Sequence, residues 1–239
     1  MLATLSWWGR LLTMDHSRMC YRVYKFRREH IRENRISWCG VVKSQLQELK
    51  LEQYWMSEDI GELSSWRALI KSRIGAHESR AWRERLLEKP KLRLYRRVKS
   101  DLAFEQYLLD IPELKFRRIF AMMRGGTNQL RIETGRYVEE EVHERTCFVC
   151  GSDAVEDEGH VLIDCISYEV LRRRMFQDIC YRTGDVYKLS QRREDKDWLV
   201  GLLLGNGVTE KGHRVIVKQA VARFFYRAMR SRTQWLGDL

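Results

Sequence analysis

Four residues in the second half of the chain combine the side-chain types and the spacing of a metal site. Cys147 and Cys150 are separated by two residues, His160 and Cys165 by four, and nine residues lie between the two pairs. Structural zinc sites are built from four sulfur or imidazole ligands arranged as a tetrahedron. The sequence therefore predicts that Cys147, Cys150, His160 and Cys165 bind one zinc ion.

The spacing within each pair explains how four ligands would reach one ion. Two intervening residues allow a tight turn that directs both cysteine sulfurs to the same side, and Gly151 permits a close backbone approach. His160 and Cys165 lie just over one helical turn apart. His143 is an alternative ligand to His160, although its place in the acidic stretch 139–144 favours a surface position.

Other patterns of catalytic chemistry are missing from the sequence. Four protein ligands leave no open position on zinc for a water molecule, so the metal is expected to be structural. The chain contains no Walker-type glycine loop, no His-Glu-x-x-His and no Gly-x-Ser-x-Gly motif. We interpret the acidic segment 156–158 as a solvated turn beside the metal, and Cys20, Cys39 and Cys180 as ordinary buried thiols. We therefore expect no catalytic residues and no enzymatic activity.

Charge indicates the class of partner. The 239 residues include 44 Lys and Arg against 33 Asp and Glu, a net charge of +11, which favours RNA or DNA as a partner. No signal peptide is recognisable, and no apolar stretch approaches the roughly 20 residues that cross a bilayer. We expect an intracellular protein with reduced thiols, in the nucleus or the cytoplasm, with neither a membrane nor a small molecule as its partner.

The composition and the apolar periodicity predict a mainly α-helical fold, an amphipathic bundle with a small Cys-Cys-His-Cys (CCHC) zinc subdomain. Only two prolines interrupt the chain, and apolar residues recur at helical spacing over about 41–55, 63–87, 92–108, 113–124, 168–182 and 214–232. Four glycines between residues 201 and 212 loosen the chain before the last helix. The predicted divisions are a basic N-terminal segment (1–61), a helical region (62–128), the zinc module with its following helix (129–182) and a C-terminal helical segment (183–239).

A basic surface beside the metal is the predicted binding site for nucleic acid. Its candidate residues are Arg93, Arg96, Arg97, Lys99, Arg117, Arg118, Arg124, Arg172 and Arg173. Such side chains neutralise phosphates, and exposed aromatic rings such as those of Phe148 or Tyr137 would stack on bases. The alternative is that these cations form only the solvated faces of amphipathic helices.

Further short segments accompany the four metal-ligand candidates. They are Leu94-Tyr95 with Lys99, Glu105 with Tyr107-Leu108, residues 130–137, the segment 156–158, and Tyr168 and Arg172 after Cys165. Together, over about residues 46–176, these segments and the four candidates resemble the C-terminal region of reverse transcriptases from non-LTR (LINE-type) retrotransposons, which carries a CCHC element downstream of the polymerase. The resemblance implies a zinc-binding module that helps to hold RNA or target DNA during reverse transcription.

The chain departs from that family in one important respect. A reverse transcriptase needs adjacent aspartates in its palm to hold two metal ions, and this sequence contains no Asp-Asp dipeptide. We therefore expect a non-catalytic, nucleic-acid-associated zinc module without the polymerase. The alternatives are a zinc-stabilised scaffold for protein interactions, using Trp55, Trp66, Trp82 and the last helix, or a non-functional remnant of an element. The sequence does not predict an oligomeric state.

Overall fold

The computed structural model describes residues 1–30, 37–189, 191–192 and 194–237. Contacts divide the chain into two compact units, Met1–Arg85 (unit 1) and Leu86–Leu239 (unit 2). The described residues are mostly helical, with a single small sheet of two strands, so the prediction of a mainly α fold is confirmed. The boundary between the units falls inside the predicted region 62–128, and residues from 129–182 and 183–239 share one core.

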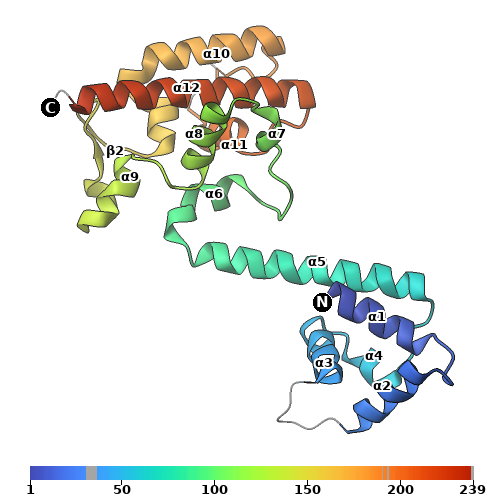
Figure 1. The fold of residues 1–239 in the computed structure, drawn as a ribbon. Helices are drawn as coiled ribbons and strands as arrows, with labels where there is room; N and C mark the ends of the chain where they lie inside the picture. Colours follow the sequence, from blue (N-terminus) through green and yellow to red (C-terminus); the bar gives the residue numbers. More distant parts are fainter. Residues whose placement is uncertain (31–36, 190, 193, 238–239) are drawn as a thin grey trace. The chain divides into compact units, whose positions relative to one another are not determined.

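Unit 1 is built around an aromatic core. Its helices are α1 (Leu2–Leu12), α2 (Met19–Glu29), α3 (Trp38–Glu48), α4 (Glu52–Ser57) and α5 (Leu63–Leu87), which continues two residues into unit 2 (Figure 1). The Trp8 ring lies 6.1 Å from the Trp55 ring and 5.6 Å from the Trp66 ring, measured between centroids. Because Trp55 and Trp66 are buried, they stabilise unit 1 and are not the partner-binding surface expected of them in the scaffold alternative.

Hydrogen bonds satisfy the polar atoms of this aromatic core. The indole Nε1 of Trp8 donates to Tyr24 Oη (3.1 Å), and that of Trp66 donates to the Leu5 carbonyl (3.1 Å). Helix α1 can approach Trp66 closely because it has a glycine at position 9, where a Cβ would lie 2.5 Å from the indole ring. Buried tryptophans need partners for their N–H groups, and unit 1 supplies them locally.

Two predicted helices are each divided in the structure. The prediction over 41–55 is replaced by α3 and α4, because Lys50 has a φ of 57° and the chain turns so that Leu49 and Leu51 enter the core. The prediction over 92–108 is likewise replaced by two shorter helices. The intervening segment turns around the buried Lys99, whose Nζ donates to the Ala103 carbonyl at 2.5 Å.

Unit 2 is organised around its last helix. Its elements before the metal-site candidates are η1 (Pro90–Leu92), α6 (Arg93–Val98), α7 (Tyr107–Asp110), α8 (Leu114–Arg124), α9 (Arg131–Thr134), η2 (Gly135–Val138) and η3 (Val142–Glu144). The remaining elements are β1 (Thr146–Cys147), β2 (Ser152–Val155), the π-helical η4 (His160–Asp164), η5 (Ile166–Tyr168), α10 (Glu169–Thr183), α11 (Lys196–Leu204) and α12 (Lys211–Gly237). Helix α12 packs against α7, α8, α10 and α11 (Figure 1) and brings Val217, Val221 and Phe225 into the core.

Helix α11 lies in the segment that the glycines were expected to loosen. Leu199, Leu202 and Leu203 are buried in the core, and this burial overrides the unfavourable helix propensity of Gly201. The buried Lys218 of α12 donates from Nζ to the carbonyl oxygens of Leu202 (3.3 Å), Leu203 (3.0 Å) and Gly205. A lysine from another helix therefore satisfies the carbonyl groups that every helix leaves unpaired at its C-terminus.

None of the helices within the described ranges is both long enough and apolar enough to cross a bilayer.

Candidate metal centre

The four predicted ligands lie together in unit 2. Their ligand atoms all lie within 4.8 Å of one another, with 4.0 Å between the Sγ atoms of Cys147 and Cys165. The Cys150 Sγ lies 3.4 Å from His160 Nε2. Tetrahedral zinc with bonds of about 2.3 Å to sulfur places its sulfur ligands roughly 3.8 Å apart. The arrangement fits one tetrahedral ion, and the prediction of a Cys and His cluster that could hold a metal is confirmed.

The first two ligands are held by the small hairpin. Strands β1 and β2 pair antiparallel, with Cys147 opposite Ser152. The Gly151 amide donates to the Cys147 carbonyl (3.0 Å), and Gly151 has a φ of 65°, in the left-handed region that favours glycine. The hairpin turn thus directs both sulfurs to one side, as the spacing predicted.

A wide helical turn brings His160 and Cys165 together. The Cys165 amide donates to the His160 carbonyl (2.7 Å), a hydrogen bond across five residues that defines the π-helix η4. The three residues that follow His160 are fully buried in the core of unit 2. Because these three side chains pack in the core, they hold the wide turn in place. The two candidate ligands at its ends are therefore positioned without an ordinary α-helix.

The guanidinium of Arg172 fixes this turn from within the protein. Arg172 is 1% exposed, and it donates from Nε to the Leu162 carbonyl (2.9 Å) and from Nη2 to the Cys165 carbonyl (2.7 Å). It also donates from Nη2 to the Val161 carbonyl (3.3 Å). The prediction that Arg172 contacts nucleic acid is corrected, because the side chain lies under the metal-ligand turn rather than on the surface.

Hydrogen bonds among the candidate ligands shift their pKa values. The hydrogen bond with Cys165 and burial raise the pKa of Cys147 to about 12, while the same hydrogen bond lowers the pKa of Cys165. Burial disfavours the charged imidazole of His160, but hydrogen bonds with the thiols of Cys147 and Cys150 outweigh it and raise the pKa to about 9. Because a metal binds thiolate and neutral imidazole, binding must release protons.

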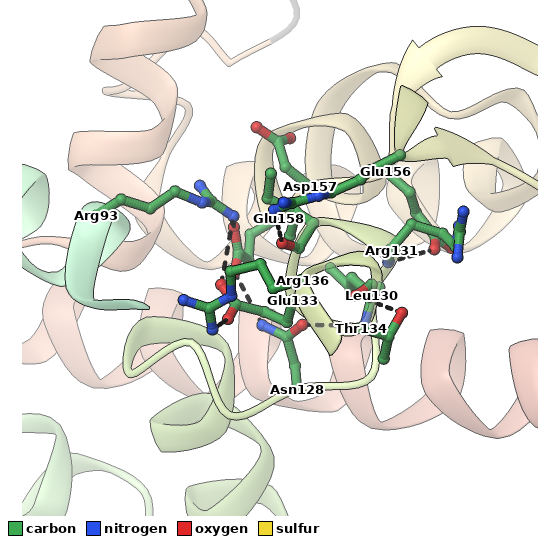
Figure 2. Close-up of polar contacts among 12 residues, drawn as sticks. Arg93, Asn128, Leu130, Arg131, Glu133, Thr134, Arg136, Glu156, Asp157 and Glu158 are labelled. Carbon is green, nitrogen blue, oxygen red and sulfur yellow. Dashed lines mark hydrogen bonds and ion pairs between the residues drawn. The ribbon is translucent and has the colours of Figure 1, made fainter. Parts of the chain in front are cut away.

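The acidic segment beside the ligands is buried, which corrects the prediction of a solvated turn. Glu156 is 0% exposed, and its two oxygens accept from Nε and Nη2 of Arg232, each at 2.9 Å. One of these oxygens also accepts from the Arg131 amide at 2.8 Å (Figure 2). The carboxylate therefore joins the end of α12 to the start of α9, directly beside Cys147, whose Sγ lies 4.0 Å from Glu156 Oε1.

A second buried carboxylate joins helix α6 to the segment before His160. Glu158 is 1% exposed and accepts from Arg93 Nη2 (2.5 Å) and from Asn128 Nδ2 (2.8 Å). Figure 2 shows Arg93 and Asn128 converging on it, beside Glu133 and Arg136. Burial raises the pKa of Glu133. The positive charge of Arg136 opposes this rise, whereas the negative charge of Glu158 adds to it. Arg93 was also a predicted phosphate contact, but its guanidinium pairs with a buried carboxylate and stabilises the fold.

The other predicted nucleic-acid contacts are divided between the interior and the surface. Lys99 and Arg124 are buried and both face Glu105, Arg124 at 2.7 Å from its Oε2. Arg97 is exposed but pairs with Asp197. Arg96, Arg118 and Arg173 are exposed and Arg117 is half-buried. The sequence showed where the cations lie along the helices, but not which of them face buried carboxylates.

An arginine groove lies between helices α10 and α12. It has a volume of about 230 Å³, with an apolar floor that includes Met175 and Phe224. Its polar lining residues are Arg174, Arg223, Arg227 and Asp178. Arg223 and Arg227 are four residues apart, so helical spacing alone places them on one face of α12, but the approach of Arg174 depends on how two distant helices pack.

The remaining predicted thiols and the alternative ligand can also be placed. His143 is exposed in η3 and lies outside the four-residue cluster. Cys39 is buried as predicted, but Cys20 is exposed, with its Sγ 3.2 Å from Met14 Sδ, and Cys180 is only partly buried. The prediction of three buried thiols is therefore correct only for Cys39.

Comparison of the chain with family models, with curated proteins and with solved structures found no significant match.

Proposed function

We propose that this chain is a non-catalytic, zinc-stabilised module that binds RNA or DNA, comparable to the C-terminal region of non-LTR retrotransposon reverse transcriptases without their polymerase. The observation that carries the proposal is the double role of helix α10. Its buried Arg172 holds the turn between two metal ligands. The next residues, Arg173 and Arg174, are exposed, and Arg174 lines the arginine groove. A metal that orders this turn would also fix the start of a cationic helix.

Zinc is the metal that best fits the ligand set. Three sulfurs and one imidazole form a closed tetrahedral site in which zinc would be structural, with no position left for a substrate. The buried Nδ1 of His160 has no hydrogen-bond partner among the described residues, while Nε2 faces Cys150. This donor set thus accounts for the ring orientation, since Nε2 faces the cluster as a ligand would.

Metal analysis tests this part of the proposal. Protein purified without chelators should contain about one zinc per chain, because the described residues hold one set of four Cys and His side chains that could bind a metal. A Cys150→Ser variant should lose most of the metal, whereas Cys20→Ser, which changes an exposed thiol outside the cluster, should retain it. Full zinc occupancy in Cys150→Ser would refute the ligand set.

The arginine groove and Phe148 supply the contacts that a nucleic acid needs. Arg174 and Arg227 are exposed and form no ion pair with other described residues. Phe148 is 56% exposed, and the Arg131 guanidinium lies 4.3 Å from its ring centroid. Cations that follow a phosphate backbone, together with an exposed aromatic face, are typical of proteins that bind single-stranded nucleic acids.

Salt-dependent binding tests the nucleic-acid part. Fluorescence anisotropy with labelled single-stranded RNA should show binding at low salt that weakens steeply as salt rises. Replacing both Arg174 and Arg227 by Gln should lower the slope of log affinity against log salt by about 1.4, since each lost phosphate contact removes about 0.7. The matched control replaces the exposed Arg73 and Arg80 of unit 1 by Gln. No binding at low salt, or equal slopes in both variants, would reject the proposed surface.

A further inference from the structure

A groove with a basic rim is open between helices α8 and α12 of unit 2. It has a volume of about 730 Å³ and is lined by Glu113, Leu114, Lys115, Arg118, Ile119, Met122 and Tyr226, which together form the basic groove. Leu114 is 69% exposed at its edge. Arg118 has no ion-pair partner among the described residues. Lys115 pairs with the exposed Glu113 (3.3 Å), and its Nζ also lies 5.8 Å from the Tyr226 ring centroid. The basic groove therefore combines an unfilled apolar floor with a net positive charge, because its lining has two cations and one carboxylate.

An exposed segment of the same unit has the complementary properties. Residues 137–144, here called the acidic knob, expose Tyr137 (80%), Val138 and Val142 to solvent. The exposed carboxylates of Glu139, Glu141 and Glu144 lie among them and make no ion pair with any residue that the structure describes. Glu140 differs, because it faces inward and pairs with Arg131. The acidic knob thus presents apolar side chains within a ring of negative charge.

Hydrogen bonds from buried groups fix the backbone of the acidic knob. Arg145 is buried and donates from Nε (3.1 Å) and Nη2 (2.6 Å) to the Glu140 carbonyl, and from Nη1 to the Ile132 carbonyl (2.9 Å). The Glu140 amide also donates to the Gly135 carbonyl (3.0 Å). A surface that is already ordered loses little conformational entropy when it binds, so these contacts suit the acidic knob to recognition.

We propose that the acidic knob of one copy docks in the basic groove of a second copy. Tyr137 would enter between Leu114 and Met122, since a large aromatic side chain is the usual anchor of an interface. The carboxylates of Glu139 and Glu141 would then lie near Lys115 and Arg118. In a single chain the groove is open and the knob is exposed, so the two surfaces meet only between copies.

The charge around Tyr137 argues against nucleic acid as the occupant. Three unpaired carboxylates within seven residues of this ring repel phosphates, so base stacking on Tyr137 is disfavoured. A protein surface carrying lysine and arginine has the opposite effect, and the basic groove of this chain supplies it. The contact does not depend on RNA or DNA binding, which the arginine groove and Phe148 are proposed to provide.

The proposed contact joins two different surfaces, so its symmetry can be tested. Each copy that donates its acidic knob still has an open basic groove, and such a heterologous interface produces chains or closed rings of copies rather than a two-fold dimer. A variant that lacks one surface should therefore remain a monomer. A mixture of two variants, each lacking a different surface, should stop at a dimer.

Sedimentation velocity with two variants tests the proposal. The groove variant carries Lys115→Glu and Arg118→Glu, and the knob variant carries Tyr137→Ala and Val138→Ser, which leaves its carboxylates in place. All four side chains are exposed, so zinc content and far-ultraviolet circular dichroism should match the wild type. Asp153→Lys, an exposed acidic residue outside the acidic knob, is the control and should associate as the wild type does.

The wild type should form species larger than a monomer as its concentration rises, and high salt should weaken them. Each variant alone should stay monomeric at those concentrations. An equimolar mixture should give a dimer that grows no further, because only one intact groove and one intact knob remain per pair. A wild type that is monomeric throughout, a groove variant that associates normally, or a mixture that stays monomeric would overturn the proposal.

Discussion

The two units bury different kinds of side chain. In unit 1, the described core consists of apolar and aromatic residues such as Trp8, Trp66 and Ile70, and its main ion pairs, from Lys25 and Arg28 to Glu58, lie at the edge. In unit 2, the interior contains paired charges, among them Glu156 with Arg232 and Glu158 with Arg93. Among the described residues, every buried polar or charged side chain lies after Leu86.

This difference indicates how the stability of each unit depends on the contacts of its buried side chains. Truncating an apolar core side chain costs the transfer free energy of the lost atoms plus a term for the cavity left behind, so the loss depends on how well the neighbours fill the space. A buried charge that loses its partner is destabilising by several kcal/mol, because it remains away from water without compensation. Single substitutions of charged residues near the metal-ligand candidates should therefore lower the free energy of unfolding of unit 2 strongly. Unit 1 should be destabilised mainly by substitutions that change the shape of its core.

Metal removal should separate the two units most strongly. Structural zinc contributes on the order of 10 kcal/mol in small zinc modules, and here the ligand turn also positions Arg172. A chelator should therefore speed amide exchange across residues 129–168 by more than about a hundredfold. A rate change of that size requires the loss of only a small part of the free energy that zinc contributes. Hydrogen exchange measured by mass spectrometry checks this. Equal changes in unit 1, or none in residues 129–168, would contradict the comparison.

Breaking the Glu156–Arg232 pair should produce the next largest effect. Glu156→Gln leaves the Arg232 guanidinium buried without its counter-charge, so unit 2 should lose about 3–5 kcal/mol of unfolding free energy. The matched change in unit 1 is Lys25→Met. Its partner Glu58 keeps Arg28, and the pair is partly exposed, so the loss should stay below about 1 kcal/mol.

A double variant distinguishes loss of a charge pair from loss of shape. Glu156→Leu with Arg232→Met should recover most of the stability that Glu156→Gln loses, because buried ion pairs can be replaced by apolar side chains with little loss. Urea unfolding, monitored by hydrogen exchange in each unit, gives the free energy of unfolding of all three variants. If the double variant is as unstable as Glu156→Gln, the pair contributes through its geometry and not through its charge.

The sequence predicted the metal-ligand cluster because its signals are local. Two cysteines separated by two residues reach the same side of a turn whatever the rest of the chain does, and the apolar stripe of α12 likewise needs only helical spacing. Helix α11 was missed because local glycine content was unfavourable, while the burial that stabilises the helix and its cap from Lys218 come from another part of the chain.

The burial of charges could not be predicted from local spacing. Glu156 reads as solvated in sequence because two further acidic residues follow it directly, yet its partner Arg232 lies 76 residues further along the chain. Arg172 reads in sequence as a surface arginine of an amphipathic helix, and only the packing of η4 against α10 shows that it faces three carbonyl groups. Where a charge is paired depends on tertiary contacts, so the predicted phosphate surface contained both structural and exposed cations.

Two glycine substitutions should show that unit 1 depends on shape. In Gly9→Ala the new Cβ would lie 2.5 Å from the Trp66 ring, so α1 or Trp66 must move, with a loss of about 1–3 kcal/mol. Gly75 in α5 has no atom within 4 Å of its Cβ position, and Gly75→Ala should instead stabilise by about 0.5–1 kcal/mol. Thermal unfolding followed by tryptophan fluorescence compares them. Equal effects of the two changes would argue against tight packing at Gly9.

The last expected effect is a pH dependence carried by Lys218 in unit 2. Burial, strengthened by the nearby charge of Arg124, lowers the pKa of Lys218 to about 7 in the folded state, from an ordinary value of 10.5. Between these values the unfolded chain binds more protons than the folded one, so this residue makes stability rise with pH there. Below about pH 7 both states are protonated and the contribution is constant.

The increase should be about 1 kcal/mol over the first pH unit above that value, because a full proton difference corresponds to about 1.4 kcal/mol per unit. Lys218→Met should unfold more easily, because the carbonyl groups at the end of α11 lose their donor, and should lack this part of the slope. Comparing the two proteins at each pH by urea unfolding cancels the titration of other groups. Parallel pH profiles would show that Lys218 keeps its charge throughout, held by the three carbonyl oxygens that it contacts.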